Sequence, residues 1–203
     1  MIKILIVEDQ TMLRQSLDNL LNAQDDIEVI GGTDDASKAP ELCKKLKPDI
    51  ILMDVMTKND SNGIRYTAEI RKEFPEIKVV IMTGLPEITF ADEARKAGAH
   101  SFIYKDMDNE HLLYVIRRTI KGMNIYSGSD ECQPFANRFT EREIKIIRMI
   151  CQGIKRDSIA KKLEISESLV KHQITSILDK SGFDTIGEFA IYAVSKGLIV
   201  PNL

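Results

Sequence analysis

The first 122 residues contain five short apolar runs separated by helix-length segments, and this alternation limits the possible fold more than any other feature. Each run has the length of a strand, about four to eight residues. Parallel strands need a long crossover between them, usually a helix, so this alternation predicts a parallel sheet. We expect the strands at 2–7, 27–31, 50–54, 77–82 and 100–104.

We therefore expect residues 1–122 to form an α/β doubly wound domain, with a five-stranded parallel sheet in the order 2-1-3-4-5. Its helices are expected at about 11–23, 36–47, 63–74, 86–97 and 106–121. Gly98 occupies the stop position of the fourth helix. Asp106 or Asp108 is the candidate cap of the fifth.

The third strand, in the stretch PDIILMD from Pro48 to Asp54, is an unbroken apolar run closed by a carboxylate. Such a run is typical of a strand buried on both faces of a parallel sheet. Ligands of open α/β sheets bind just beyond the carboxyl ends of the strands, where Asp54 should lie. Considered alone, an aspartate that merely starts a turn is the commoner explanation.

Polar side chains also follow three other predicted strands: Glu8 and Asp9, then Thr83, then Lys105. Because the strands are parallel, these side chains should meet Asp54 at one rim of the sheet. Clustered carboxylates are costly unless a cation lies among them, and oxygen ligands suit Mg²⁺. Since a carboxylate can accept a phosphoryl group, the rim is a candidate phosphoryl site. Each residue alone is equally compatible with a solvated strand end.

Charge is divided unevenly along the chain. Residues 1–122 carry 17 Lys and Arg against 21 Asp and Glu, whereas residues 138–203 carry 11 against 8. An acidic first part and a mildly basic tail indicate different partners for the two. The tail's excess of three positive charges is too small to establish nucleic-acid binding.

We expect a cytoplasmic protein rather than a membrane or secreted one. No apolar run approaches the roughly 18 residues of a membrane span, and residues 1–10 lack a signal peptide's apolar core. Cys43, Cys132 and Cys151 are odd in number and far apart, which indicates a reduced, cytoplasmic protein.

Residues 123–137 are rich in Gly, Ser and Asn without periodicity, which indicates a linker. The tail, residues 138–203, begins with a capping-box signature at Thr140 and Glu143, and Ser166 is the candidate cap of its third helix. That helix carries an apolar stripe and a separate polar stripe, the latter formed by Ser168, Lys171, His172 and Thr175. The pattern fits an all-α four-helix helix-turn-helix domain and a solvated helical bundle equally well.

The rim residues make residues 1–122 resemble the receiver domain of two-component response regulators. This resemblance implies that Asp54 is the phosphoacceptor and that Lys105 pairs with the phosphoryl group. It implies that Thr83 and Phe102 form the switch pair.

The same resemblance implies a bound Mg²⁺ ion. Asp9, Asp54 and the backbone carbonyl of Met56 would hold this ion, with Glu8 acting mainly through water. It also points to the side chains of Met56 and Leu85 as those that flank the water in phosphate hydrolysis. Neither is a useful hydrogen-bonding group, so we expect slow self-dephosphorylation.

The loop after Asp54 departs from the receiver pattern. Lys58 stands where the family has a proline, and Gly63 lies nine residues after the acceptor instead of eight. One residue is inserted. The sequence leaves open whether Mg²⁺ binding and phosphorylation tolerate this change.

The segment 139–182 resembles the LuxR-type DNA-binding domain of the NarL/FixJ response regulators. The resemblance rests on these residues of the present chain: Thr140, Arg142, Glu143, Gly153, Ile159, Ala160, Val170 and Lys171. It implies that Lys171, His172 and Thr175 lie nearest DNA, with Ser168 on the same stripe and Lys155 and Lys180 as weaker phosphate contacts. Leu169 and Gln173 depart from the family pattern, so no DNA sequence preference is transferred.

Together the resemblances imply a transcriptional response regulator rather than an enzyme. A cognate sensor histidine kinase would phosphorylate Asp54, and the activated homodimer would bind promoter DNA. One alternative is a DNA-binding regulator whose receiver only dimerises, independently of phosphorylation. Another is a Mg²⁺-dependent phosphohydrolase, which the sequence disfavours because neither Asp9 nor Asp54 has an aspartate two residues later.

Overall fold

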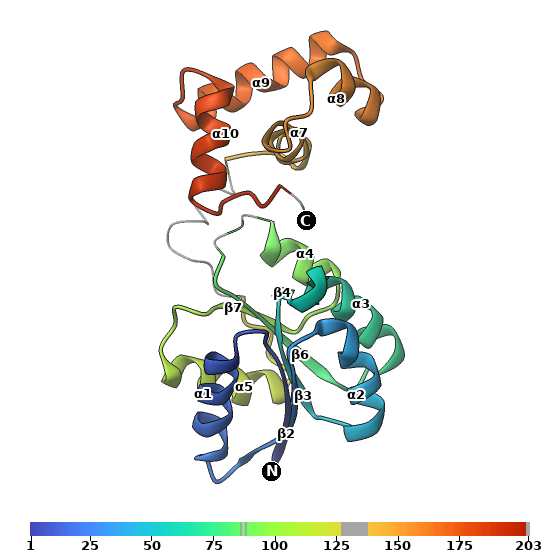
Figure 1. Cartoon of the computed structure of the whole chain (residues 1–203), viewed down its shortest axis with the longest axis vertical. Helices are drawn as coiled ribbons and strands as arrows, with labels where there is room; N and C mark the ends of the chain where they lie inside the picture. Colours follow the sequence, from blue (N-terminus) through green and yellow to red (C-terminus); the bar gives the residue numbers. More distant parts are fainter. Residues whose placement is uncertain (86, 88, 127–137, 202–203) are drawn as a thin grey trace. The chain divides into compact units, whose positions relative to one another are not determined.

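The computed structural model describes residues 1–85, 87, 89–126 and 138–201 (Figure 1). The chain divides into two compact units. The first contains residues 1–84 and the described residues from Phe90 to Tyr126. The second contains residues 138–201 together with Leu85, Glu87 and Thr89.

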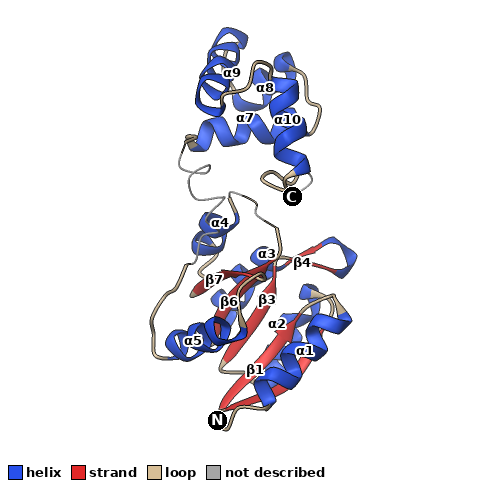
Figure 2. Cartoon of the chain, turned by 90° about the vertical axis from the view of Figure 1, so that its left-hand side faces the viewer, coloured by secondary structure: helices blue, strands red, loops and turns tan. Residues whose placement is uncertain are grey.

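The first unit is built on five parallel strands in the order β2-β1-β3-β6-β7 (Figures 1 and 2). This is the predicted order 2-1-3-4-5, so the doubly wound fold is confirmed. The strands and helices are β1 (Ile2–Val7), α1 (Thr11–Asn22), β2 (Ile27–Thr33), η1 (Ala36–Lys38), α2 (Ala39–Leu46), β3 (Ile50–Asp54), α3 (Gly63–Glu73), β6 (Lys78–Thr83), α4 (Phe90–Lys96), β7 (Ser101–Tyr104) and α5 (Asn109–Ile120).

Helices cover both faces of this sheet. α1 and α5 lie on one face, and α2 and α3 lie on the other (Figure 1). Side chains from β1, β3 and β6 pack against α1 and α5 in one core, which includes Ile4, Leu52, Val80, Leu21 and Val115. β3 is buried along its whole length, as predicted. A one-residue slip of β3 would exchange its two apolar faces, so this burial fixes the position of Asp54.

The polar loop predicted after Asp54 contains a small hairpin that the sequence did not predict. β4 (Met56–Thr57) pairs antiparallel with β5 (Ser61–Asn62), and the short 3-10 turn η2 (Lys58–Asp60) joins them. Asn59 and Asp60 have φ values of 61° and 54°, in the left-handed region. The hairpin therefore accommodates the extra residue, because two consecutive left-handed residues turn the chain back toward α3.

Two other boundaries differ from the sequence prediction. The fourth helix begins at Phe90, not near 86, and Pro86 itself lies outside the described residues. Just before the helix, the Glu87 carboxylate accepts hydrogen bonds from the N–H and the hydroxyl of Thr89. Asp108, rather than Asp106, caps α5 by accepting from the His111 N–H at 2.7 Å.

The start of the predicted linker packs on the first unit. The Phe102 N–H donates to the Ile125 carbonyl at 2.8 Å, and the Tyr126 hydroxyl donates to the Ala99 carbonyl at 2.6 Å. The remaining predicted linker residues, 127–137, lie outside the described residues, as does Cys132. In the described part of the chain, no helix has both the length and the apolar character that a bilayer crossing requires.

The second unit is helical, as predicted, with α7 (Glu141–Cys151), α8 (Arg156–Leu163), α9 (Glu167–Ser181) and α10 (Ile186–Ser195). Its core joins the four helices through Ile147, Ile159, Val170, Ile177 and Phe189. The predicted caps at Thr140 and Ser166 form, and Thr140 completes a capping box with Glu143. α10 is capped by Thr185, which forms a capping box with Glu188.

Candidate functional site

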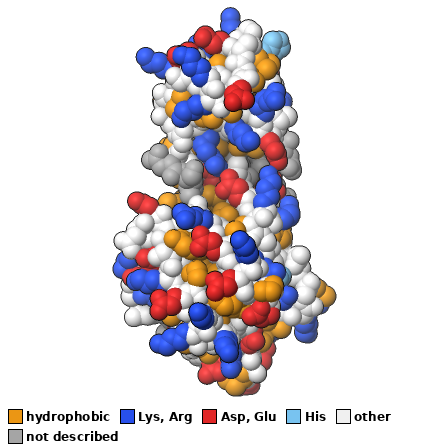
Figure 3. All heavy atoms as spheres, turned by 90° about the vertical axis from the view of Figure 1, so that its right-hand side faces the viewer, with side chains coloured by type: hydrophobic (Ala, Val, Ile, Leu, Met, Phe, Trp, Pro, Cys, Tyr) orange, Lys and Arg blue, Asp and Glu red, His pale blue; other side chains and the backbone are white. Residues whose placement is uncertain are grey.

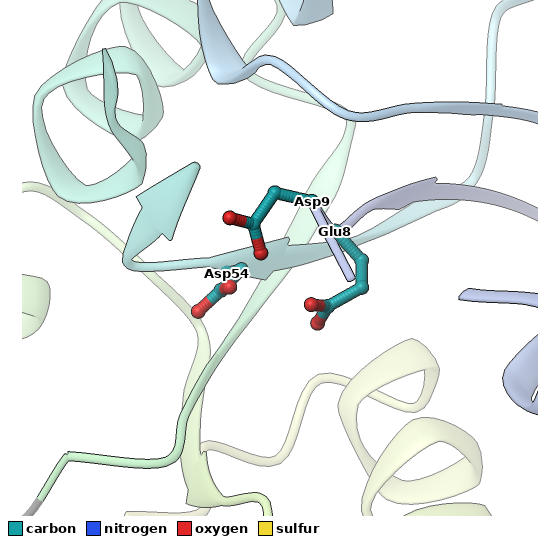
Figure 4. Close-up of side chains that lie close together, drawn as sticks. All are labelled: Glu8, Asp9 and Asp54. Atoms are coloured by element: carbon teal, nitrogen blue, oxygen red, sulfur yellow. The ribbon is translucent and has the colours of Figure 1, made fainter. Parts of the chain in front are cut away.

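Three carboxylates converge at the carboxyl ends of β1 and β3. Glu8 and Asp9 follow β1, Asp54 ends β3, and their side chains approach one another across the rim (Figure 4). Each contributes a carboxylate oxygen to a group whose members lie within 4.8 Å of one another. Glu8 is fully buried and Asp54 is 5% exposed, whereas Asp9 is half-buried. The carboxylates predicted to meet therefore do so.

Lys105 supplies the positive charge of this rim. Its ammonium nitrogen lies 2.7 Å from Glu8 Oε2 and 2.7 Å from Asp54 Oδ2. Burial favours the neutral form of Lys105, but the two carboxylates outweigh burial and raise its pKa. Burial also raises the pKa of Asp54 to about 6, against the effect of Lys105 and with a contribution from Glu8. One ammonium thus leaves the three carboxylates incompletely neutralised.

The two predicted switch residues lie on neighbouring strands. Thr83 ends β6, is almost fully buried, and its carbonyl accepts from the Lys105 N–H at 2.8 Å. Phe102 in β7 is fully buried and packs edge-to-face on Tyr104, with ring centres 5.3 Å apart. Gly84 has open space at its Cα, where an added Cβ would meet only the Lys105 side chain at 3.9 Å.

Gly63 brings the start of α3 directly against the phosphoacceptor candidate. Its N–H donates to the Val55 carbonyl at 2.8 Å. A Cβ at this position would lie 2.0 Å from the Asp54 carbonyl oxygen, a distance that no side chain can occupy. A glycine is therefore required at this position, because the backbone of α3 approaches the backbone of Asp54 too closely for any side chain. The extra residue in the loop does not change this requirement.

The donor set fits Mg²⁺. The three carboxylates offer only oxygen ligands, and their charge exceeds that of the single ammonium among them. Met56 begins β4 two residues after Asp54, and its N–H lowers the pKa of that carboxyl group. Met56, whose backbone carbonyl is the implied fourth ligand group, is thus close in the chain to Asp54.

The polar stripe predicted on the third helix of the tail lies on α9. Ser168, Lys171, His172 and Thr175 are all exposed, whereas Val170, Ile174 and Ile177 on the same helix are buried. α8 ends at Leu163, and the left-handed φ of 53° at the following residue, Glu164, makes the tight turn before α9. This is helix-turn-helix geometry with a free polar surface on its second helix.

The two weaker DNA-contact candidates differ in their surroundings. Lys155 is exposed and its side chain makes no cap hydrogen bond at the start of α8. Lys180 forms an ion pair with Glu143, its nitrogen lying 2.7 and 2.6 Å from the two carboxylate oxygens. On the face drawn in Figure 3, Lys and Arg side chains are interspersed with Asp and Glu.

Replacing Lys180 with methionine should destabilise the protein by about 2 kcal/mol, because Glu143 is 2% exposed and would lose its charged partner. Burial raises the pKa of Glu143, but Lys180, Thr140 and Ser176 outweigh it and lower this pKa to about 2. The pair's contribution should be complete above pH 4.5 and lost as pH falls toward 2. Chemical denaturation of the full chain from pH 3 to 7 measures both effects; equal stability of variant and wild type would contradict them.

Sequence reasoning missed a second polar cluster at the rim. The Asp35 carboxylate, in the loop between β2 and η1, accepts hydrogen bonds from Ser61 and Asn59 of the hairpin. The available signal was the acidic pair Asp34-Asp35 directly after a strand, as for Glu8 and Asp9. The strand was predicted to end at Gly31, whereas β2 continues to Thr33, so the signal was not recognised.

Both units match known protein families. Residues 4–117 match the model of the response regulator receiver domain, and residues 137–193 match that of the bacterial regulatory proteins of the luxR family. The response regulator protein VraR of Staphylococcus epidermidis is 33% identical over 212 residues, covering 98% of this chain and 99% of VraR.

Solved structures agree with this match. A LuxR-family two-component response regulator from Aurantimonas is 27% identical with a TM-score of 0.58, covering 61% of this chain and 87% of that protein. The RcsB response regulator of Salmonella typhimurium is 18% identical with a TM-score of 0.70, covering 96% of this chain and all of the other. At that identity, the RcsB similarity concerns the fold alone.

Proposed function

Because this chain belongs to the DNA-binding two-component response regulators of the LuxR family, we propose that a cognate histidine kinase phosphorylates it on Asp54. Phosphorylation then controls dimerisation and promoter binding. The observation that carries the proposal is the position of Asp54, at a strand end within reach of two further acids and one ammonium.

The transfer is a substitution at phosphorus. An Asp54 carboxylate oxygen attacks the phosphoryl group of the kinase phosphohistidine, a P–O bond forms, and the P–N bond breaks. The imidazole that leaves takes up a proton. Asp54 must be ionised to attack, and its pKa of about 6 leaves it largely ionised at neutral pH.

Lys105 and Thr83 stabilise the product. The phosphoryl group adds roughly −1.5 to −2 charges. The Lys105 ammonium, now 2.7 Å from Asp54, is placed to pair with a phosphoryl oxygen, and the Thr83 hydroxyl at the end of β6 to donate to another. In this proposal Thr83 and Phe102 then change position together, which alters the surface used for dimerisation.

Mg²⁺ would be held by Asp9, Asp54 and the Met56 carbonyl, with Glu8 acting through water. When bound, it neutralises negative charge on the reacting phosphoryl oxygens. The receiver family generally binds Mg²⁺ at its acidic site, and the acids present here fit that ion.

Mg²⁺ should raise the melting temperature of the unphosphorylated protein. An ion that binds only the folded state stabilises it by about 2.7 kcal/mol at 100 times its dissociation constant. Calorimetry of wild type and Asp9→Asn with increasing MgCl₂ measures this shift, with NaCl at matched ionic strength as control. A shift of the same size in Asp9→Asn would contradict the assignment of this ligand.

DNA is the partner of the second unit, and α9 is the proposed reading helix. Its exposed stripe of Ser168, Lys171, His172 and Thr175 would face the major groove, with Lys155 as an additional phosphate contact. Lys180 was expected to contact phosphate, but we assign its main role to the pair with Glu143. We propose residues 1–122 as the receiver domain, 123–137 as the linker and 138–203 as the DNA-binding domain. Because its proposed partner is promoter DNA, we also propose that the protein acts in the cytoplasm.

Two rival functions motivate the test. The first is a phosphorylation-independent regulator, which the inserted loop residue suggested. The carboxylates of Glu8, Asp9 and Asp54 nevertheless lie within 4.8 Å of one another, which argues against a disrupted metal site. A phosphohydrolase would turn over a phosphate donor rather than retain its phosphate.

Phosphoryl transfer can be tested with acetyl phosphate and Mg²⁺, followed by intact-mass measurement. We expect one stable phosphoryl group on wild type and on Asp60→Asn, an exposed acid of the same loop, and none on Asp54→Ala. Continuous release of phosphate would support the hydrolase. Absence of labelling in wild type would support the phosphorylation-independent regulator.

Once formed, the phosphoryl group should be lost slowly. Met56 and Leu85, the residues expected to flank the hydrolytic water, cannot orient it. We therefore expect a lifetime of minutes or longer, and several-fold faster loss in Met56→Gln, which adds an amide at a 40% exposed position. Phosphate release after donor removal measures both; loss from wild type within seconds would contradict this prediction.

A further inference from the structure

Asp35 joins two loops at the rim of the sheet. Its carboxylate is 4% exposed and accepts from the Ser37 N–H of its own loop at 2.9 Å. It also accepts from the Ser61 hydroxyl at 2.7 Å and the Asn59 side-chain amide at 2.8 Å. These donors keep the pKa of Asp35 well below its usual range, so the carboxylate is ionised at neutral pH.

The hairpin held by Asp35 carries groups adjacent to the phosphoacceptor. In that hairpin Ser61 pairs with Thr57, and the next pair is Asn62 with Met56. Met56 begins β4 two residues after Asp54 and provides the carbonyl proposed as a metal ligand. Because the Ser61–Thr57 pair is adjacent to the Asn62–Met56 pair, a displacement of Ser61 should also displace the Met56 carbonyl.

The Asp35 loop is also attached to the other side of the site. The Asp35 N–H donates to the Thr33 hydroxyl at 3.3 Å, and the Thr33 carbonyl accepts from the Glu8 N–H at 2.9 Å. The Ala36 N–H donates to the Thr57 hydroxyl at 2.9 Å. This loop thus connects the backbone that carries Glu8 with the hairpin that follows Asp54.

The turn of the hairpin contains two left-handed residues, Asn59 and Asp60. Asn and Asp adopt this conformation more readily than other non-glycine residues, but less readily than glycine, so a contact that holds it adds support. The Asn59 amide is one of the donors to Asp35, so the carboxylate holds the turn at one of its left-handed residues. The loop that contains the extra residue is therefore held in place by its hydrogen bond to Asp35.

We propose that Asp35 is a positioning residue for the Mg²⁺ and phosphoryl site, acting through Asn59 and Ser61 on the Met56 carbonyl. It touches neither the ion nor the phosphoryl group. The inference rests on the proposed function, because it assumes that Mg²⁺ binds at Asp9 and Asp54.

The test compares Asp35→Ala with wild type by isothermal titration of the full-length protein with MgCl₂. Loss of a residue that orients metal ligands typically weakens metal binding by about 10- to 100-fold, and we expect the lower end of that range. Amides of residues 56–62 should also exchange faster with solvent in the variant.

A second readout separates positioning from general damage. Phosphorylation by acetyl phosphate is measured as a function of Mg²⁺ concentration. In Asp35→Ala the half-saturating Mg²⁺ concentration should rise about tenfold, in step with the titration. The rate at saturating Mg²⁺ should stay within about threefold of wild type, because the reacting groups themselves are unchanged.

Two further variants serve as controls. Asp34→Ala removes the neighbouring acid, whose partners Lys38 and Lys58 are exposed, and should leave Mg²⁺ affinity unchanged. Ser61→Ala removes a single donor to Asp35 and should weaken Mg²⁺ binding by a smaller factor. It provides the comparison if Asp35→Ala fails to fold.

The outcomes separate this inference from the proposed function. If wild type binds Mg²⁺ and is phosphorylated, but Asp35→Ala and Ser61→Ala titrate like wild type, the positioning role is wrong and the proposed function stands. If a folded Asp35→Ala loses the saturating rate without a change in Mg²⁺ affinity, the positioning role is also wrong. If wild type itself neither binds Mg²⁺ nor accepts phosphate, both fall.

Discussion

Replacing Gly63 with alanine should destabilise the first unit by about 3 kcal/mol and abolish phosphorylation of Asp54. The added Cβ would lie 2.0 Å from the Asp54 carbonyl oxygen and 2.8 Å from the Met53 side chain. The first of these is a backbone atom of a buried central strand, so relief requires α3 or β3 to move. Overpacking of this kind lies at the upper end of the usual 1–3 kcal/mol cost.

Gly187→Ala is the matched control for this substitution. Gly187 lies inside α10 and has nothing within 4 Å of the position of an added Cβ. Alanine there should be neutral or stabilising by up to about 1 kcal/mol, since it is the better helix former. Calorimetry and acetyl phosphate labelling of both variants measure the effects. Normal labelling of Gly63→Ala would show that the start of α3 can move away from Asp54 without consequence.

The second large effect is expected at α9. Replacing Lys171 and His172 together with alanine should weaken specific DNA binding by about 100-fold, since each good base contact contributes roughly 1–3 kcal/mol. Both side chains are exposed, and the helix core formed by Val170 and Ile174 is untouched, so folding should be preserved. Fluorescence anisotropy on a fragment selected by the wild-type protein from random DNA measures the loss.

Lys196→Ala provides the charge-matched control for the α9 variant. Lys196 is an exposed lysine at the end of α10, outside the helix-turn-helix. Its removal lowers net charge by one and should change affinity by only a few-fold. Equal losses in the two variants would contradict the assignment of α9, because binding would then depend on charge alone.

The sheet order and the meeting of the acids could be predicted from sequence because both follow from local patterns. Apolar runs of strand length indicated the strands, and the parallel connections between them predicted that Asp9, Asp54 and Lys105 lie at the same edge of the sheet. The polar stripe of α9 was predicted for the same reason, since helical spacing alone separates it from the buried face.

The features that could not be predicted depend on contacts between distant residues. The hairpin after Asp54 is held by Asp35, which is 24 and 26 residues away from its partners Asn59 and Ser61. Asn and Asp tolerate the left-handed conformation, but local sequence does not show that Asn59 and Asp60 adopt it in succession. Likewise, the ion pair between Lys180 and Glu143 could not be predicted, because the two residues are 37 positions apart in the sequence.

The most direct test of the whole account is the DNA affinity of one protein preparation before and after phosphorylation. Wild type and Asp54→Ala are each titrated with the selected DNA fragment, with and without acetyl phosphate and Mg²⁺. We predict that phosphorylation tightens binding by wild type at least tenfold, and that Asp54→Ala binds with the same weak affinity in both conditions. Equal affinity of phosphorylated and unphosphorylated wild type would contradict the link between the acidic rim and DNA.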